Sequence, residues 1–489
     1  MKINKNITAV VLTSALGIMV WGCSKSGNGS SGGEVTPTPQ PVVTPVKTDV
    51  AMWLTHPDGA YYFKKQNVAL LFNTNSNTNA TIEVDTTQAY QTIDGFGYTL
   101  TGGSATLINS LPSAQKDTLI KELFATDASN IGVSYIRISL GASDLSAEPF
   151  TYDDLPAGQA TDMDLQKFSI DRERVDLIPI LKKILAINPA IKILACPWSA
   201  PTWMKTNNSF KNGNLKPEYY DVYARYFIKY IQAMKAEGIT IDAVTPQNEP
   251  LNPYNNPSLV MQAVDQSAFI KGYLGPQFKA AGINTKIIVY DHNADVPEYP
   301  ITILNDPAAN QYVDGSAFHL YAGSISALST VHDAYPNKNI YFTEQWVGGP
   351  GNFTGDLNWH INNLIIGATR NWSRNVLEWN LAADPNYRPY TNGGCSTCLG
   401  ALTIGGSTVT RNVPYYIIAH ASKFVRPGAR RIGSNMVANL PNVAFKTADG
   451  KKVLIVLNSS NAQQSFNIKF NGKTTTATLG NNAVATFIW

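Results

Sequence analysis

Length, composition and charge exclude several classes of protein. The chain has 489 residues, of which 44% are hydrophobic, so it can bury a large core and is not a disordered protein. Only 15% of the residues are charged, whereas 10% are aromatic, and such a surface suits uncharged, ring-shaped ligands. The 38 basic and 35 acidic residues leave a net charge of +3 without a clustered excess of Lys and Arg, so nucleic acid is not an expected partner.

Residues 1–22 are predicted to be a signal peptide. Lys2 and Lys5 form a basic start, residues 7–21 are an uncharged apolar run, and a glycine and Cys23 end it. The run is shorter than the roughly 20 residues that a membrane span needs. The junction is similar to a bacterial lipoprotein signal, in which Cys23 becomes the lipidated first residue, and plain signal cleavage is the alternative. We therefore expect an exported, monomeric protein, held at the cell-surface or periplasmic face of the outer membrane only by this lipid.

Residues 23–49 have the Ser, Gly, Pro and Thr content of a flexible linker. The cysteines beyond it are Cys196, in an apolar run, and Cys395 and Cys398, which form a Cys-x-x-Cys pattern. In an exported protein this pattern indicates a disulfide, half of a zinc site or a redox pair, but zinc would need two more ligands and there is no second pair. We favour a disulfide between Cys395 and Cys398, with Cys196 as a buried thiol and no metal site.

From residue 89 to residue 428, short apolar runs alternate with longer amphipathic segments. Such a rhythm predicts parallel strands joined by helical crossovers. Eight strand–helix pairs fit a (β/α)8 TIM barrel, and a doubly wound open sheet is the alternative. The predicted pairs are 91–100 with 113–124, 134–140 with 171–187, 191–196 with 217–236, 241–245 with 265–281, 286–290 with a poorer helix near 301, 313–320 with 325–334, 339–343 with 358–371, and 375–379 with 415–425.

The two flanks of this region have a different pattern. Residues 50–88 and 429–489 lack long helical periodicity, and Asp449-Gly450 is a typical hairpin turn. We therefore expect an all-β sandwich side domain that is built from both ends of the chain.

Two glutamates follow predicted barrel strands. The fourth strand leads into Asn248-Glu249-Pro250, and the seventh ends in Glu344. Barrel active sites lie at the C-terminal ends of the strands, and glycoside hydrolysis uses two carboxylates there. One such glutamate alone would more often make a structural hydrogen bond or a surface ion pair. Two glutamates over one barrel mouth favour a glycosidase.

Residues 50–489 resemble glycoside hydrolase family 30, whose members are retaining (β/α)8 enzymes with a β side domain formed by both chain ends. The matching segments are DGFG at 94–97, YIRIS at 135–139, ACPWSAPTWMK at 195–205, NEP at 248–250, FHLY at 318–321, FTE at 342–344, WNL at 379–381 and SKFVRPG at 422–428.

This resemblance implies that Glu249 is the general acid/base and Glu344 the nucleophile. The acid should then have a raised pKa, whereas the nucleophile should stay ionised among hydrogen-bond donors. Arg137 and Tyr321 are candidate donors to Glu344, and Asn248 is a candidate partner of the sugar 2-hydroxyl. A barrel-floor ion pair is the alternative for Arg137, and a packed aromatic is the alternative for Tyr321.

The resemblance also implies three further substrate-binding residues. Trp198 and Trp379 are similar to the family's sugar platforms, in which a ring face packs on a pyranose. His319 is a candidate contact in the same site, and its alternative is a core histidine bonded to backbone.

The predicted substrate rests on two short segments. Gly102 stands where the glucosylceramide-cleaving relatives carry an Asp for the terminal glucose, so ceramide specificity is not expected. LTGGSA at 100–105 and NGGCSTCLG at 392–400 resemble the endo-β-1,6-glucanase branch. The resemblance implies an endo-acting enzyme on β-1,6-glucan and gentio-oligosaccharides that needs no cofactor. The alternatives are a β-glucosidase, glucosylceramidase or xylanase specificity, or a non-catalytic glycan-binding lipoprotein.

Overall fold

The computed structural model describes residues 45–489. The predicted signal peptide, the lipidation site Cys23 and the linker up to residue 44 lie outside the described residues. Between residues 45 and 489 no helix is long and apolar enough to cross a membrane. The side domain was predicted to begin at residue 50, and its contacts begin shortly before that residue. The Asp49 amide, for example, donates to the Leu70 carbonyl at 3.0 Å.

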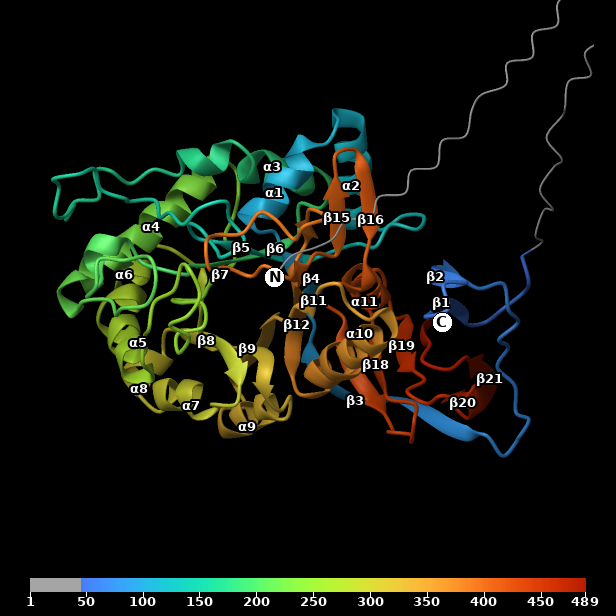
Figure 1. The fold of residues 1–489 in the computed structure, drawn as a ribbon. Coiled ribbons are helices and arrows are strands. Elements are labelled where there is room, and N and C mark those ends of the chain that lie inside the picture. Colours follow the sequence, from blue (N-terminus) through green and yellow to red (C-terminus); the bar gives the residue numbers. More distant parts are fainter. Residues whose placement is uncertain (1–44) are drawn as a thin grey trace, which may run out of the picture. The chain divides into compact units, whose positions relative to one another are not determined.

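Eight parallel strands close into a barrel in the order β10-β12-β4-β5-β6-β7-β8-β9, which confirms the predicted fold and excludes an open sheet (Figure 1). Strands such as β4 and β5 are buried at every position, which explains their continuous apolar sequences. The barrel strands are β4 (Gly95–Thr99), β5 (Tyr135–Ser139), β6 (Lys192–Cys196), β7 (Ala243–Val244), β8 (Lys286–Ala294), β9 (Val313–Gly323), β10 (Asn339–Glu344) and β12 (Ser373–Asn380).

The helices follow these strands as predicted, but π-helical stretches at residues 270–274 and 361–368 interrupt two of them. The sequence explains the first interruption. The segment predicted as one helix over 265–281 consists of α5, a π-helical stretch η4 and α6, because Pro276 at the start of α6 has no N–H to donate. The α-helices are α1 (Gly102–Ser110), α2 (Ser113–Phe124), α3 (Leu177–Ile187), α4 (Tyr220–Ala236), α5 (Ala263–Phe269), α6 (Gly275–Ala280), α7 (Glu298–Leu304), α8 (Pro307–Asn310), α9 (Ala327–Ala334), α10 (Phe353–His360) and α11 (Val413–Ser422). The 3-10 and π segments are η1 (Asp171–Arg174), η2 (Thr202–Met204), η3 (Pro217–Tyr219), η4 (Ile270–Leu274) and η5 (Ile361–Ala368).

The barrel interior is packed rather than open. Seven of its strands each contribute one buried residue to a common apolar layer: Tyr135, Leu194, Ala243, Ile288, Ala317, Tyr341 and Leu377. Gly97 lets β4 approach β5 closely, since a Cβ there would lie 1.9 Å from the carbonyl oxygen of Tyr135. The apolar layer closes the barrel below the polar side chains at the strand ends.

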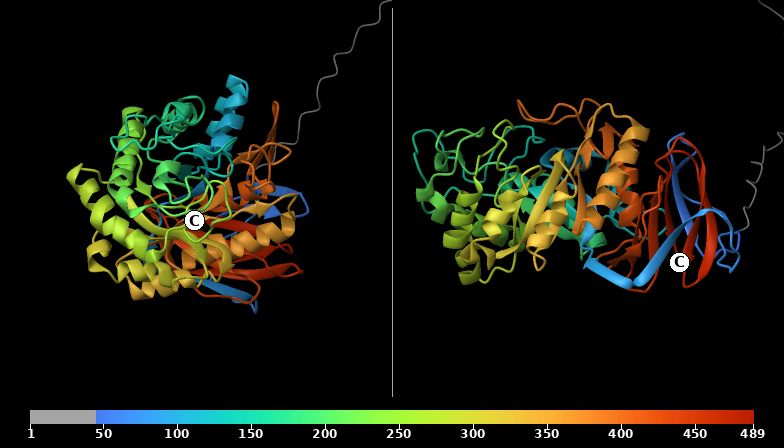
Figure 2. Two further views of the ribbon diagram at one scale, coloured as in Figure 1. Left: turned by 60° about the vertical axis from the view of Figure 1, so that its left-hand side comes forward. Right: turned by 90° about the horizontal axis from the view of Figure 1, so that it is seen from below.

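The side domain is a β-sandwich that draws strands from both chain ends, as predicted (Figure 2). Its strand order is β2-β1-β22-β19-β18-β17-β3-β20-β21, in which β3 pairs with β17 on one side and with β20 on the other. The strands are β1 (Ala51–His56), β2 (Tyr61–Lys65), β3 (Ala80–Thr92), β17 (Arg430–Ser434), β18 (Asn442–Lys446), β19 (Lys452–Leu457), β20 (Gln464–Phe470), β21 (Lys473–Leu479) and β22 (Val484–Ile488).

Strand β19 joins the two hydrophobic cores. Leu454 and Val456 pack inside the sandwich, whereas Val453, Ile455 and Leu457 belong to the core of the barrel. Because both faces of β19 are buried, its sequence is a continuous apolar run. Short additional strands lie in the barrel loops: β11 (Val347–Gly348), β13 (Ala382–Ala383), β14 (Cys398–Leu399), β15 (Leu402–Gly405) and β16 (Thr408–Arg411).

Candidate active site

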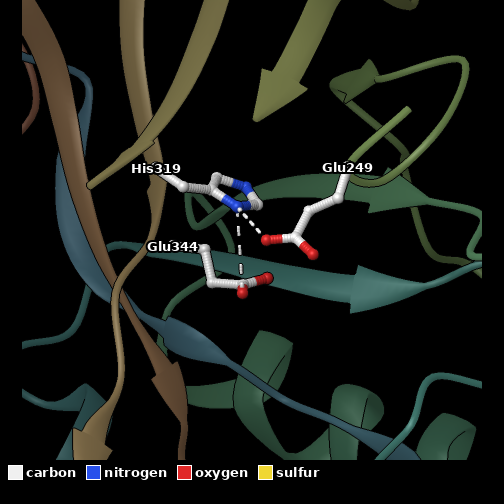
Figure 3. Close-up of side chains that lie close together, drawn as sticks. All are labelled: Glu249, His319 and Glu344. Carbon is white, nitrogen blue, oxygen red and sulfur yellow. Dashed lines mark hydrogen bonds and ion pairs between the residues drawn. The ribbon is translucent and has the colours of Figure 1, made fainter. Parts of the chain in front are cut away.

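Glu249 and Glu344 face each other across the C-terminal mouth of the barrel. Glu249 follows β7, Glu344 ends β10, and His319 on β9 lies between them (Figure 3). The His319 Nδ1 atom is 3.2 Å from Glu249 Oε1 and 3.8 Å from Glu344 Oε1. Each glutamate is only 6% exposed. The structure thus brings the two predicted catalytic residues together around a histidine.

The backbone at Glu249 is strained. Its φ of 43° lies in the left-handed region, which residues other than glycine rarely adopt. The Glu249 amide donates to the Asp291 carbonyl at 2.9 Å, and the Asn252 amide donates to the Glu249 carbonyl at 2.8 Å. The Glu249 side chain also accepts from Asn252 Nδ2 at 2.7 Å and from Asn255 Nδ2 at 3.3 Å. This conformation turns the carboxyl group into the site.

Glu344 is held by two donors, both of which are residues singled out from the sequence. Arg137 Nη1 donates to Glu344 Oε2 at 2.5 Å, and the Tyr321 hydroxyl donates to Glu344 Oε1 at 2.9 Å. Arg137 Nη2 also donates to Asn248 Oδ1 at 2.6 Å, which leaves the Asn248 amide nitrogen to donate elsewhere. Arg137 is therefore not a barrel-floor ion pair, and Tyr321 is not merely a packed aromatic.

Asp291 connects these groups and is absent from the residues predicted from the sequence. It is fully buried and accepts from Arg137 Nη2 at 2.8 Å and from Thr343 Oγ1 at 2.6 Å. His319 Nε2 lies 3.1 Å from Asp291 Oδ1, so His319 joins two carboxylates and is not a backbone-bonded core histidine. The fifth strand was predicted to end at residue 290, whereas β8 continues to Ala294 and so includes Asp291. An acidic residue directly after that apolar run was the available signal.

The charges of the site shift the pKa values of its acids and of its histidine. Burial acts to raise the pKa of Glu249, but the hydrogen bond and charge of His319 lower it to about 2. Burial raises the pKa of Glu344, against the charges of His319 and Arg137. Burial acts to lower the pKa of His319, but the charge of Glu344 and the bonds to Asp291 and Glu249 raise it to about 9. The pKa of His319 is therefore raised and that of Glu249 is lowered, so the raised pKa expected for Glu249 is not found.

A third carboxyl group, Asp144, lies in the loop after β5. It is 5% exposed, and burial together with the charge of Glu344 raises its pKa to about 7. A Cβ at Gly102 would meet Ser146 Oγ at 3.2 Å, in the loop that carries Asp144. Asp144 thus places a third carboxyl group near the two glutamates, from the loop that faces Gly102.

Trp198 and Trp379 lie beside each other under the mouth. Their ring centroids are 5.4 Å apart, and the Arg137 guanidinium lies over the Trp198 ring at 4.8 Å. Trp198 is 1% exposed and Trp379 is 3% exposed. The two rings form a buried wall rather than open platforms, and their contact with a sugar stays a prediction.

Cys395 and Cys398 form a disulfide, and Cys196 is a buried free thiol. The Cys196 Sγ atom is 3.0 Å from Asp291 Oδ2, so the thiol belongs to the same buried network.

Glu249, His319 and Glu344 also offer three atoms within 4.8 Å of one another that could ligate a metal. The permanent positive charge of Arg137 beside Glu344 opposes a second cation at this position. The arrangement is better suited to holding and moving a proton.

A barrel with two buried glutamates after its fourth and seventh strands defines a glycoside hydrolase. Residues 93–425 match the glycosyl hydrolase family 30 TIM-barrel domain, and residues 428–487 match the family 30 beta sandwich domain. The chain belongs to glycosyl hydrolase family 30.

Two curated relatives and one solved structure illustrate its place in the family. An endo-1,6-beta-D-glucanase of Neurospora crassa is 36% identical over 403 residues, which cover 78% of this chain and 82% of the relative. A putative glucosylceramidase 4 of Caenorhabditis elegans is 30% identical over 457 residues, covering 88% of this chain and 86% of the relative. The solved structure of the endo-beta1,6-glucanase BT3312 superposes with a TM-score of 0.84 at 36% identity, covering 91% of this chain and 99% of that one.

Proposed function

We propose that this hydrolase cleaves β-1,6-glucosidic bonds within β-1,6-glucan and gentio-oligosaccharides, with retention of the anomeric configuration. The observation that carries the retaining mechanism is the short distance between the two acids: an oxygen of Glu249 and an oxygen of Glu344 lie within 4.8 Å. Retaining glycosidases separate their carboxyl groups by about 5 to 5.5 Å, whereas inverting enzymes need roughly 6.5 to 9.5 Å to admit a water.

In this mechanism Glu344 attacks the anomeric carbon while Glu249 protonates the leaving oxygen. The glycosidic bond breaks, and the sugar becomes an ester of Glu344. Glu249 then takes a proton from water, whose oxygen displaces Glu344 from the same carbon. The contacts support these roles, because Glu344 is fixed by the permanently charged Arg137, whereas Glu249 is bonded only to neutral amides and to His319.

The pKa values of the free site require one further step. Glu249 is ionised there and His319 carries the proton, yet Glu249 must be protonated when the glycosidic bond breaks. We infer that His319 Nδ1 passes its proton to Glu249 Oε1 over their 3.2 Å contact once substrate excludes water. The proton on His319 is held mainly by the charge of Glu344, and that charge disappears as the ester forms.

The substrate is proposed from the relatives and from the acids of the site. The chain is 36% identical to endo-1,6-beta-D-glucanases in both comparisons, over more than three quarters of its length. Asp144, a buried carboxyl group near the two glutamates, is suited to accept hydrogen bonds from hydroxyl groups of the bound glucose.

Product analysis on β-1,6-glucan tests this proposal, with laminarin and xylan as controls and Glu344→Gln as the inactive variant. Early gentio-oligosaccharides with the β configuration, released by the wild type alone, are the expected result. Release of glucose alone would show that the enzyme acts at chain ends (exo action) and not within the chain (endo action). A glucan that is retained on a gel without cleavage would favour the glycan-binding alternative.

We also propose that the protein is exported and anchored by a lipid on Cys23. The basic start, the apolar run and the Gly-Cys junction support this location. In a bacterial host, Cys23→Ser should move the protein from the membrane fraction to the soluble fraction, and an unchanged distribution would contradict the lipid anchor.

A further inference from the structure

The loop between β13 and β14 ends in a turn that the Cys395–Cys398 disulfide closes, and the loop contacts three other loops at the barrel mouth. The loop follows the eighth barrel strand, β12, which carries neither Glu249 nor Glu344. Its last part, residues 391–397, includes two glycines and no large apolar side chain with which to hold a conformation. The disulfide restricts the turn at its end.

The first contact is with Asp144. The Cys395 amide donates to Asp144 Oδ2 at 3.2 Å, and the Thr391 amide donates to the Asp144 carbonyl at 2.9 Å. Gly394 packs so closely that a Cβ would lie 2.4 Å from the same carbonyl oxygen. The loop therefore holds both the backbone and the carboxyl group of Asp144.

The second contact is with the loop after Glu249. Asn256 Nδ2 donates to the Asn392 carbonyl at 2.9 Å, and the Thr391 hydroxyl donates to the Asn256 carbonyl. The same loop carries Asn255, which donates to the carboxylate of Glu249. Movement of the disulfide loop would thus be transmitted to a segment that orients Glu249.

The third contact is with the segment after Glu344. Strand β14 pairs with β11, so that Cys398 faces Gly348 and Leu399 faces Val347. The Gly349 amide also donates to the Thr397 carbonyl at 2.7 Å. The Cys398 side chain is buried in a cluster with Trp198 and Trp379, the wall of the site.

We propose that the disulfide-closed loop, residues 391–399, is a positioning element that sets Asp144 and the two glutamate-bearing segments relative to one another. The inference rests on the proposed function, because it assigns the loop a part in aligning those acids on a sugar. The loop acts through these neighbours and need not touch the sugar itself. Misplacement of reacting groups by about 1 Å can lower a rate by roughly 100-fold, so a small shift of the loop has a measurable effect.

The first test removes the disulfide by the double substitution C395S/C398S. The matched control is Ser396→Ala, an exposed position in the same turn. Kinetics on β-1,6-glucan are measured well below the unfolding temperature of every variant. We expect KM to rise by at least about fivefold and kcat to fall for the double variant, with wild-type values for the control.

The second test keeps the disulfide and displaces the loop. Gly394→Ala places a methyl group against the Asp144 carbonyl and should raise KM in the same direction. Wild-type KM and kcat in both variants would overturn the proposal. A fall in the maximal rate alone, equal to the loss of folded protein in each variant, would overturn it as well. A wild-type enzyme that does not cleave the glucan would instead overturn the proposed function, so the two failures can be told apart.

Discussion

The two ends of the barrel both carry charged side chains but bury them differently. At the C-terminal mouth, Arg137 and Asp291 are fully buried, and each contacts more than one charged group. At the N-terminal end, Lys192 pairs with Asp242 at 2.7 Å, and the lysine side chain is 45% exposed. Buried charges are costly unless they are paired, whereas exposed ion pairs contribute little. The buried charges therefore mark the end where chemistry takes place, and the exposed pairs mark the end that only closes the fold.

A hollow by itself does not make this distinction. A cavity of about 570 Å³ lies at the N-terminal end, lined by Lys192, Asp242 and Tyr341 among others. Lys192 in that lining is already paired with Asp242, and its side chain is largely exposed. The buried Tyr341 hydroxyl in the same lining contacts Lys286 and Asp314, but burial raises the pKa of Tyr341 and keeps it neutral, whereas Asp291 is charged. For the residues that the structure describes, the arrangement of buried charge is a better guide to the site than the size of a cavity.

The largest expected effect comes from removing Glu249, the proposed general acid/base. Glu249→Ala should lower kcat/KM on β-1,6-glucan by about 1,000-fold, because the poor leaving group then departs without a proton. An aryl glucoside with a good leaving group should be affected less. Added azide should restore turnover and give the β-glucosyl azide, since azide attacks the Glu344 ester without a general base. An α-glucosyl azide would contradict the double displacement.

Asp291→Asn should destabilise the protein by about 3 to 5 kcal/mol, because Arg137 is then buried with one acid fewer. Burial acts to raise the pKa of Asp291, but Arg137 and His319 hold it well below its usual value. Its contribution is therefore present above the unfolded-state pKa of about 3.9 and is lost as the pH falls.

Urea unfolding at pH 7 and at pH 3 measures this difference between the wild type and Asp291→Asn. The gap in unfolding free energy should be large at pH 7 and smaller at pH 3. An equal gap at both pH values would show that the charge of Asp291 is not what stabilises the mouth.

His319→Gln should change the pH profile as well as the rate. The wild-type site keeps its extra proton until the pH passes the His319 pKa of about 9, so activity should fall on the alkaline side near that value. Without His319 the proton resides on Glu249 and is lost at lower pH, so the alkaline limb should move downward. His292→Gln is the matched control, because burial lowers the pKa of His292 and keeps it neutral. An alkaline limb in the same place for His319→Gln would exclude His319 as the proton source.

The smallest effect is expected at the opposite end of the barrel. Lys192→Met removes the exposed pair with Asp242 and should change the unfolding free energy by no more than about 1 kcal/mol. The kcat and KM values on β-1,6-glucan should stay those of the wild type. A tenfold loss of activity would show that the two ends are not as separate as their burial indicates.

Glu249 and Glu344 were predictable because each follows an apolar strand, and a strand of known direction places its last residues at the mouth. Arg137 and Tyr321 were named for the same reason. Asp291 was not predicted, because it gains its role only where β5, β8, β9 and β10 converge. The low pKa of Glu249 could not be foreseen either, since it depends on which carboxylate His319 faces.

The sequence by itself determined the order of eight strands and helices, the side domain from both chain ends and the two glutamates at the mouth. These follow from local patterns, namely short apolar runs for buried strands and a period of 3.6 for helices, which each segment carries alone. Only the tertiary structure decided that Asp144 lies near the two glutamates, that His319 joins Glu249 to Asp291 and that one loop contacts three others. Barrel closure brings residues more than a hundred positions apart within hydrogen-bonding distance, and no local pattern records such contacts.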